Sequence, residues 1–235
     1  MFARAGVRKP NKVEGESPFW ISFSDLMSAL MVLFLVVMAV TLVAVANSVT
    51  AEEEAKIQRE KDIKALMALI RETSTDKRVR VDESTFRIDM GDIVRFDSGN
   101  YAIKPDAAQF LRGYIPIILR AKATPAGQKW LRRVVVEGFT DQDGTYLYNL
   151  ALSLNRSRSV VCSLFAAPTD RESPLNNAQL KQIQELFLVG GYSFNSVRTD
   201  KAASRRVELK IEFWGVNEQK PDDSQLLNGK EFGQC

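Results

Sequence analysis

The sequence predicts an α+β protein with a single N-terminal transmembrane helix, a helical connector and an α/β sandwich domain. The first observation is the apolar run Pro18–Ala46, in which Asp25 is the one charged residue. The second is Ala51–Arg71, which is rich in helix-forming residues. The third is that the following chain changes repeatedly between a period of two and a helical period, which is typical of strands interleaved with helices.

The apolar run is long enough to cross a bilayer. No residue of Leu26–Ala46 is charged, and a spanning helix needs roughly 20 apolar residues. The preceding PFWISF indicates a helix that begins near Pro18, because aromatic residues favour the membrane interface and proline is tolerated in a first turn. We therefore predict a transmembrane helix over 18–46 and a cytoplasmic tail over 1–17. The excess of basic residues before the run is slight, but it favours this orientation.

Asp25 is the first candidate functional residue. A carboxylate inside a bilayer costs about 2.5–3.5 kcal/mol, so such residues usually face a protein interior or carry ions. Ser22, Asp25 and Ser28 recur every three residues, and this polar stripe is expected to face a partner helix or a water path. The alternative is that Ser24 and Asp25 cap the helix at the lipid headgroups, because the run beyond them spans without Asp25.

The connector carries a narrow apolar stripe at helical spacing, formed by Ile57, Ile63, Leu66, Met67 and Ile70. We predict that residues 47–78 form a periplasmic helical linker. Three forms of this linker stay open: a stalk that self-associates, an amphipathic helix on the membrane surface, or a solvated helix.

A single folded domain is predicted over 79–215, followed by a polar C-terminal tail over 216–235. Strands are predicted at 85–90, 131–137, 187–192 and 207–213, and helices from Pro105, at 146–165 and at 178–186.

Composition excludes several function classes. Lys+Arg 32 against Asp+Glu 29 leaves a net charge of +3 without a basic block, so no nucleic-acid partner is implied. Histidine is absent, and no carboxylate pair is recognisable, so we predict no enzyme activity, no metal site and no cofactor. The two cysteines, Cys162 and Cys235, form one disulfide in an oxidising compartment or are unrelated thiols.

One motif is specific. GFTDQDG at 138–144, followed by Tyr148-Asn149, Leu152-Ser153 and Arg156, resembles the OmpA-like signature G-H-T-D-x-x-G-x-x-x-Y-N-x-x-L-S-x-x-R. The resemblance covers roughly Val79–Phe213 and implies a mixed sheet and peptidoglycan binding. Phe139 replaces the usual histidine, and Ser204 replaces an asparagine of the last conserved segment.

The resemblance implies a binding set of Thr140, Asp141, Tyr148, Asn149, Leu152 and Arg156. Diaminopimelate in peptidoglycan presents an amine beside a carboxylate, and Asp141 with Arg156 supplies the two opposite charges. Asn149, Leu152 and Arg156 share one helical stripe. In the alternatives, Asp141 and Arg156 form a structural salt bridge, Leu152 lies in the core, and Tyr148 with Asn149 forms a helix start.

The whole organisation resembles B subunits of ion-driven stator units, the MotB type, and within these it is most similar to the ZorB-type subunits of Zorya antiphage defence systems. The resemblance implies an inner-membrane protein whose dimer lies inside a pentameric ring of a polytopic MotA/ZorA-like A subunit. Asp25 would exchange a proton, or less favourably Na⁺, and peptidoglycan would hold the dimer still. The connector over 51–71 matches a channel plug in position. A flagellar-type stator and a non-conducting tether between membrane and wall are the alternatives.

Overall fold

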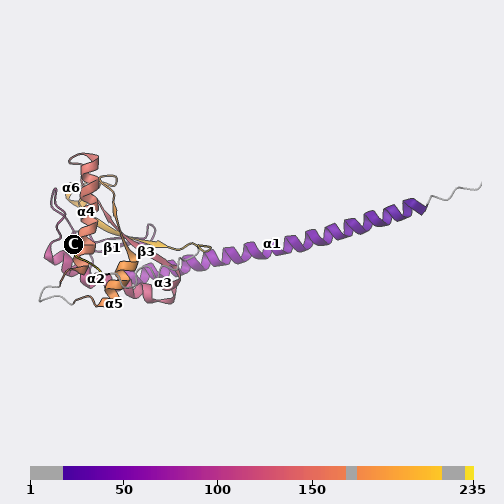
Figure 1. Ribbon diagram of the computed structural model, residues 1–235, viewed down its shortest axis with the longest axis horizontal. Helices are drawn as coiled ribbons and strands as arrows, with labels where there is room; N and C mark the ends of the chain where they lie inside the picture. The colour runs from indigo at the N-terminus through magenta and orange to yellow at the C-terminus, as the bar shows by residue number, and fades with distance from the viewer. Residues whose placement is uncertain (1–17, 168–173, 219–230) are drawn as a thin grey trace, which may run out of the picture. The chain divides into compact units, whose positions relative to one another are not determined.

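The computed structural model describes residues 18–167, 174–218 and 231–235. The predicted tail 1–17 and most of the predicted tail 216–235 lie outside these residues. The described residues fall into two compact units, which divide between Glu54 and Ala55. Figure 1 shows the helices and strands with the labels used below.

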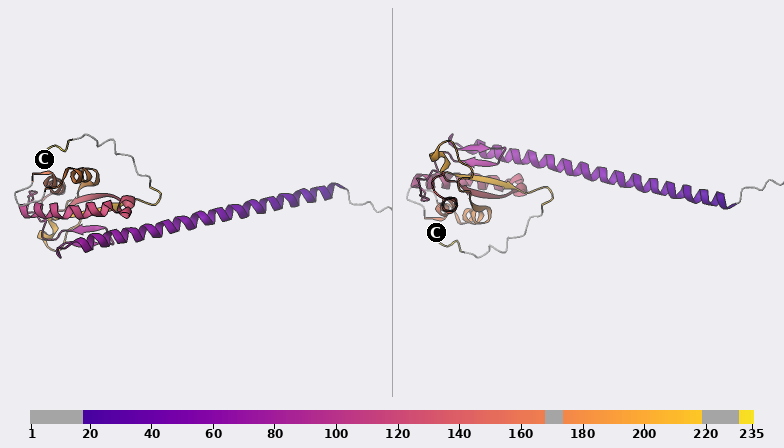
Figure 2. Two further views of the ribbon diagram at one scale, coloured as in Figure 1. Left: turned by 90° about the horizontal axis from the view of Figure 1, so that it is seen from below. Right: turned by 90° about the horizontal axis from the view of Figure 1, so that it is seen from above.

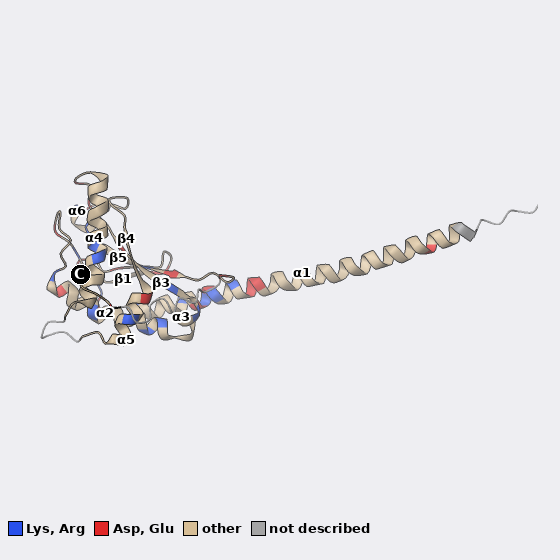
Figure 3. Cartoon of the chain, in the orientation of Figure 1, with Lys and Arg blue, Asp and Glu red and all other residues tan. Residues whose placement is uncertain are grey.

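Helix α1, Pro18–Thr73, contributes to both units. Within the described residues it is the one helix long and apolar enough to cross a membrane. Its side chains from Trp20 to Glu54 are exposed in the chain, and Figure 3 shows how few charges this part of α1 carries. The hydroxyls of Ser28 and Thr41 donate to backbone carbonyls of the same helix, both at 2.8 Å. Such internal hydrogen bonds satisfy polar groups that lipid cannot satisfy.

The second unit contains the sheet and the remaining helices. Its elements are β1 Arg80–Asp82, β2 Arg87–Asp89, α2 Pro105–Ala123, α3 Pro125–Trp130, β3 Leu131–Gly138, α4 Tyr146–Phe165, α5 Asn177–Leu186, β4 Phe187–Gly191, α6 Lys201–Ser204 and β5 Val207–Phe213. The helix starts follow local chemistry. Proline occupies the first turn of α2 and of α3, and Asn176 forms a capping box with Gln179 at the start of α5.

The sheet has the strand order β1-β2-β5-β3-β4. Strands β3 and β4 are parallel and the other neighbours are antiparallel, so the predicted mixed sheet is confirmed. On one face of the sheet Val134 lies opposite Ile211, and both side chains are buried in the core. Figure 2 shows helix α2 along one face of the sheet. The other face carries charged residues such as Glu137 and Glu208, because side chains alternate along each strand.

The C-terminal part of α1 belongs to the folded unit, which corrects the predicted boundary at Val79. Its residues Ile63, Leu66, Met67 and Ile70 are at most 3% exposed and lie in the hydrophobic core. Ile57, which the same stripe included, is 54% exposed. The prediction of a separate linker failed because the pattern shows which face of a helix is apolar and not what covers that face.

Polar contacts also attach this part of α1 to the unit. The indole N–H of Trp130 donates to Asp62 at 2.8 Å, and Arg59 donates to the carbonyl of Trp214 at 2.6 Å. The first of these hydrogen bonds lowers the pKa of the Asp62 carboxyl. The unit therefore begins near Ala55, where the chain divides.

Most predicted elements are confirmed within a residue or two, including α4 and β5 with the predicted bounds. The strand predicted at 85–90 is shorter, because Phe86 has a φ of +57° and interrupts the extended backbone. Its carbonyl still accepts from the N–H of Ile211 at 2.8 Å. The short elements β1, α3 and α6 were not predicted, because three to six residues carry too little periodicity.

Candidate ligand-binding site

The loop after β3, residues 139–145, is held at the ends of three strands. A Cβ on Gly138 would lie 2.0 Å from the carbonyl oxygen of Ser153, so only glycine allows β3 and α4 to approach this closely. The N–H of Phe139 donates to the carbonyl of Arg206 at 3.0 Å, and the N–H of Thr140 donates to the carbonyl of Ser193 at 2.9 Å. These contacts fix the start of the loop before any ligand binds.

Asn149 holds the second half of the loop. Its side-chain amide is fully buried and donates to the carbonyls of Asp143 at 2.9 Å and Thr145 at 3.2 Å. Gly144 between them has a φ of +99°, a conformation that side chains rarely adopt. Asn149 therefore takes the helix-start arrangement that was left open in the sequence.

Arg156 lies inside the unit with no exposed surface. Its guanidinium donates to three backbone carbonyls, those of Asn100 and Phe139 at 2.9 Å and that of Asp97 at 3.1 Å. Burial lowers the pKa of Arg156 to about 10, with smaller effects from Asp141 and Arg205, so the group stays cationic at neutral pH. Arg156 thus joins the 97–100 loop to the loop after β3.

Asp141 forms its ion pair with Arg205 and not with Arg156. Oδ2 of Asp141 accepts from Nη1 of Arg205 at 2.8 Å, and Oδ1 accepts from the N–H of Asp143 at 3.3 Å. Arg205 also donates from Nε to the carbonyl of Phe96 at 3.1 Å. The salt bridge between Asp141 and Arg156 considered in the sequence is therefore replaced by one with Arg205. In the sequence, the adjacent Arg205 and Arg206 just before β5 were the feature that could have indicated this partner.

The other predicted residues lie around this centre. Leu152 is 7% exposed and belongs to the interior, whereas Tyr148 is 53% exposed. The Tyr148 side chain lies beside two glycines of the neighbouring loops, because a Cβ on Gly99 or Gly144 would lie 3.4 or 3.1 Å from it. Tyr148 therefore forms the exposed wall of the site.

Two buried polar atoms at the site have no hydrogen-bond partner among the described residues. They are Oγ1 of Thr140 and Oδ1 of Asn149. Such buried atoms are uncommon in folded proteins. Of the two charged groups, Asp141 keeps 6% of its surface exposed and Arg156 keeps none, so the carboxylate of Asp141 is the charge that suits the amine of a ligand.

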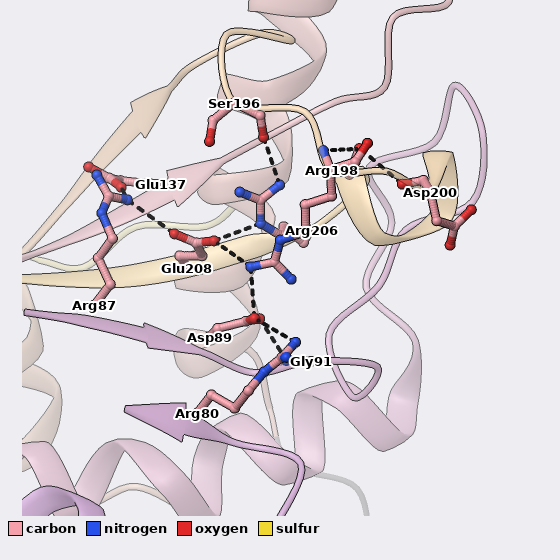
Figure 4. A network of polar contacts seen from close by, with 11 residues as sticks. Arg80, Arg87, Asp89, Gly91, Glu137, Ser196, Arg198, Asp200, Arg206 and Glu208 are labelled. Atoms are coloured by element: carbon pink, nitrogen blue, oxygen red, sulfur yellow. Dashed lines mark hydrogen bonds and ion pairs between the residues drawn. The ribbon is translucent and has the colours of Figure 1, made fainter. Parts of the chain in front are cut away.

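A second polar network lies on the charged face of the sheet (Figure 4). Asp89, Glu208 and Glu137 stand in register on three adjacent strands. Arg198 binds Asp89 at 2.8 Å and Glu208 at 2.9 Å, and Arg87 binds both Glu208 and Glu137. Each carboxylate of the row has a guanidinium partner, so the like charges on adjacent strands are compensated. Within the described residues, no group of His, Cys, Asp or Glu has a metal-binding arrangement.

Cys162 and Cys235 form a disulfide with an S–S distance of 2.06 Å. The bond attaches the segment 231–235 to α4, the helix that carries Asn149 and Arg156. The sequence had left open whether these two cysteines form a disulfide or are unrelated thiols. Within the described residues both cysteines are accounted for.

In the first unit, Asp25 lies in a shallow polar hollow on α1. Ser22, Ser24 and Ser28 line this hollow together with Trp20 and Ile21. Ser22 and Ser28 therefore accompany Asp25 on the helix surface, as the three-residue spacing predicted. The site after β3 belongs to the second unit, so the chain contains two separate candidate sites.

No family model matches the sequence. The chain is 41% identical over 223 residues to the Zorya protein ZorB of Escherichia coli O139:H28 (strain E24377A / ETEC), which covers 94% of this chain and 91% of that protein. The chain belongs to the ZorB family. The alignment covers 223 residues, so it includes residues of both units.

Solved structures similar to this ZorB-family chain share little sequence with it. The periplasmic domain of Helicobacter pylori MotB is 17% identical, with 60% of this chain and 80% of that chain covered and a TM-score of 0.38. A putative MotB-like protein from Desulfovibrio vulgaris is 18% identical, with 69% and 98% covered and a TM-score of 0.41. The OmpA-like domain of FopA1 from Francisella tularensis subsp. tularensis SCHU S4 is 16% identical, with 55% and 75% covered and a TM-score of 0.36.

Proposed function

We propose that this chain is the peptidoglycan-anchored B subunit of a proton-driven rotary motor in the bacterial inner membrane, and that the motor serves antiphage defence. The observation that carries the proposal is that one chain combines Asp25 on a spanning segment with a rigid candidate binding site in a folded unit. Membership of the ZorB family supports the defence role. The role is mechanical and not enzymatic.

The proposed assembly is a dimer of this chain inside a pentameric ring of ZorA-like subunits. The N-terminus lies in the cytoplasm and the second unit in the periplasm. The disulfide between Cys162 and Cys235 supports this orientation, because such bonds persist in oxidising compartments. Ser22 and Ser28 accompany Asp25 on one face of α1, and this face would meet the ring or a water path.

The proposed ion step uses the carboxylate of Asp25. A proton from the periplasm binds the ionised carboxylate, and the same proton then leaves toward the cytoplasm. One elementary charge that crosses a potential of 100 mV releases about 2.3 kcal/mol. This energy turns the ring only if the B dimer is held still, and attachment to the cell wall would provide that resistance.

The proposed attachment uses the site after β3. Asp141 would accept the ammonium group of diaminopimelate, and Arg205 keeps the carboxylate in place. Thr140 and Asn149 are buried and would hold the loop in shape for the same ligand. Arg156 would contribute a fixed positive charge and the shape of the 97–100 loop.

A plug formed by the connector would be confined to its first part. Leu66, Met67 and Ile70 are buried in the core, and exposing each such side chain costs about 1.5–3 kcal/mol. Residues 51–54 are exposed and precede the folded unit, so they are the part of the connector that the core does not bury.

The motor role is tested by phage survival in cells that carry the complete defence operon with Asp25→Asn at matched protein levels. Thr41→Val, a change of another polar residue on the same segment, is the control. We expect loss of protection for Asp25→Asn, because an amide exchanges no proton, and full protection for Thr41→Val. Unchanged swimming in both strains separates defence from a flagellar role. Full protection with Asp25→Asn would leave a tether that conducts nothing.

Wall attachment is tested separately by sedimentation of the full-length protein, in detergent, with purified peptidoglycan sacculi. Asp141→Ala should lose most binding, whereas Lys129→Ala, on α3, should bind as the unchanged protein does. Equal binding of the two variants would remove the site after β3 from the proposal.

A further inference from the structure

A groove runs along α4 beside the proposed wall-binding site. It has a volume of about 370 Å³ and is bounded by Tyr101 and Ile103 on one side, by α4 on the other, and by the disulfide at one end. The α4 residues Asn155, Arg158 and Ser159 line it. Concave surfaces with a few convergent polar groups are the usual places where ligands bind.

The polar side chains of this groove are unused by the fold. Across the described ranges, no hydrogen bond or ion pair engages the side chain of Tyr101, Asn155, Arg158 or Ser159. Arg156, which follows Asn155 on α4, differs from these residues because its guanidinium donates three hydrogen bonds to backbone carbonyls. The groove therefore presents a free guanidinium, an amide and a hydroxyl, together with an aromatic ring that is 51% exposed.

The groove and the proposed site are built from one common loop and one common helix. The carbonyl of Asn100 accepts from Arg156, and the next residue, Tyr101, lines the groove. On α4, Asn155 directly precedes Arg156, and Ser159 follows it by less than one turn. At about 1.5 Å of rise per residue, the groove begins within roughly 5 Å of the Arg156 position along the helix. This shared loop and helix are what would let one ligand reach from the site after β3 into the groove.

We propose that this groove is a glycan subsite, which binds the N-acetylated sugar that carries the stem peptide. The inference rests on the proposed wall-binding function. A sugar ring has an apolar C–H face and a polar rim. The exposed ring of Tyr101 offers a stacking surface for the apolar face, since tyrosine combines an apolar body with a polar end. Arg158, Asn155 and Ser159 donate hydrogen bonds to the hydroxyls and the acetamido oxygen at the rim.

The chemistry of the groove favours a sugar over a further segment of peptide. Apart from the arginine, the lining groups named here are neutral donors that also accept, as in the hydroxyl pattern of a sugar. No Asp or Glu side chain of the described residues lines the groove, and no ion pair among these residues engages the guanidinium of Arg158. The Asp141 centre recognises charge, and the groove recognises shape and hydroxyl groups.

The test compares two ligands on the full-length protein in detergent, by isothermal titration calorimetry. One ligand is the disaccharide tripeptide from peptidoglycan, and the other is the same tripeptide with diaminopimelate but without sugars. Tyr101→Ala and Arg158→Ala are the test variants. Arg120→Ala, an exposed arginine of α2, is the matched control, and Asp141→Ala reports on the proposed function itself.

We expect the disaccharide ligand to bind more tightly than the free peptide. Tyr101→Ala and Arg158→Ala should each weaken the disaccharide ligand by about tenfold, as for the loss of one good polar or aromatic contact, and leave the free peptide unchanged. If both variants bind both ligands normally while Asp141→Ala binds neither, the glycan subsite is wrong and wall binding stands. Equal loss for both ligands would assign the groove to peptide. No binding by the unchanged protein would overturn both proposals.

Discussion

The carboxylate of Asp141 is held by Arg205, which approaches to 2.8 Å from the segment that leads into β5. Arg156, the residue expected beside Asp141, turns instead to the backbone carbonyls of two loops. Two arginines with different tasks thus join the loop after β3 to the segment 96–100. Arg205 positions the candidate ligand-binding carboxylate, and Arg156 positions the loops around it.

A double-mutant cycle measures the coupling between Asp141 and Arg205. Both side chains are mostly buried, and removing either one leaves the charge of the other without its partner. We expect Arg205→Ala and Asp141→Ala each to lower the free energy of unfolding by about 1–3 kcal/mol. The double variant should cost less than the sum by at least about 0.5 kcal/mol. Strict additivity in urea denaturation would show that the pair contributes nothing.

Arg156→Lys should destabilise the second unit although it keeps the positive charge. A lysine ammonium cannot reach three carbonyls in the fork geometry of a guanidinium. We expect a loss of at least about 3 kcal/mol, since hydrogen bonds from charged groups contribute about 1.5–3 kcal/mol each. Amide hydrogen exchange should accelerate at 97–100. Arg120→Lys, at an exposed position of α2, is the control, and equal stability of the two variants would contradict the assigned role.

The core position of α1 predicts opposite results for two residues of one stripe. Met67 has no exposed surface, whereas Ile57 is 54% exposed. Met67→Ala should lower the free energy of unfolding by about 2–5 kcal/mol because it leaves a cavity. Ile57→Ala should change it by less than about 0.5 kcal/mol. Thermal denaturation of both variants would decide, and similar small effects would restore the separate linker.

The disulfide should be present in protein isolated from membranes without a reducing agent. Mass spectrometry of unreduced protein should find the peptides of Cys162 and Cys235 linked. Cys235→Ser should lower the free energy of unfolding by about 2–5 kcal/mol, as usual for the loss of a native disulfide. A reducing agent should lower the stability of the unchanged protein and leave that of Cys235→Ser as it is. Two free thiols in the unreduced sample would contradict the bridge.

Stability should fall in acid between about pH 4 and pH 2. The hydrogen bond from Arg78 lowers the pKa of Asp76 from 3.8 to about 2, and that from Arg133 lowers the pKa of Glu212. A carboxyl whose pKa is lower in the folded state stabilises the fold above its unfolded pKa. That contribution is lost as the pH falls through the folded pKa. The melting temperature measured against pH should fall less steeply for Asp76→Asn over this window.

Much of this fold follows from the sequence, because its elements carry strong local signals. The uncharged length of Leu26–Ala46 fixes a spanning segment, and alternation over 207–213 fixes a strand with one buried face. The helix 146–165 has the predicted bounds because its apolar residues repeat over five turns. The motif from Gly138 to Arg156 located the candidate site because it resembles a known signature. Composition and periodicity alone do not locate this site.

The partners of these residues were decided by the tertiary structure alone. A sequence pattern shows that Met67 faces something apolar, but only packing shows that the core of the second unit covers it. The spacing of Asp141 and Arg156 is compatible with an ion pair. The choice of Arg205 depends on where β5 begins in space, 64 residues farther along the chain. Local periodicity sets faces and lengths, whereas long-range pairing selects which charged groups meet.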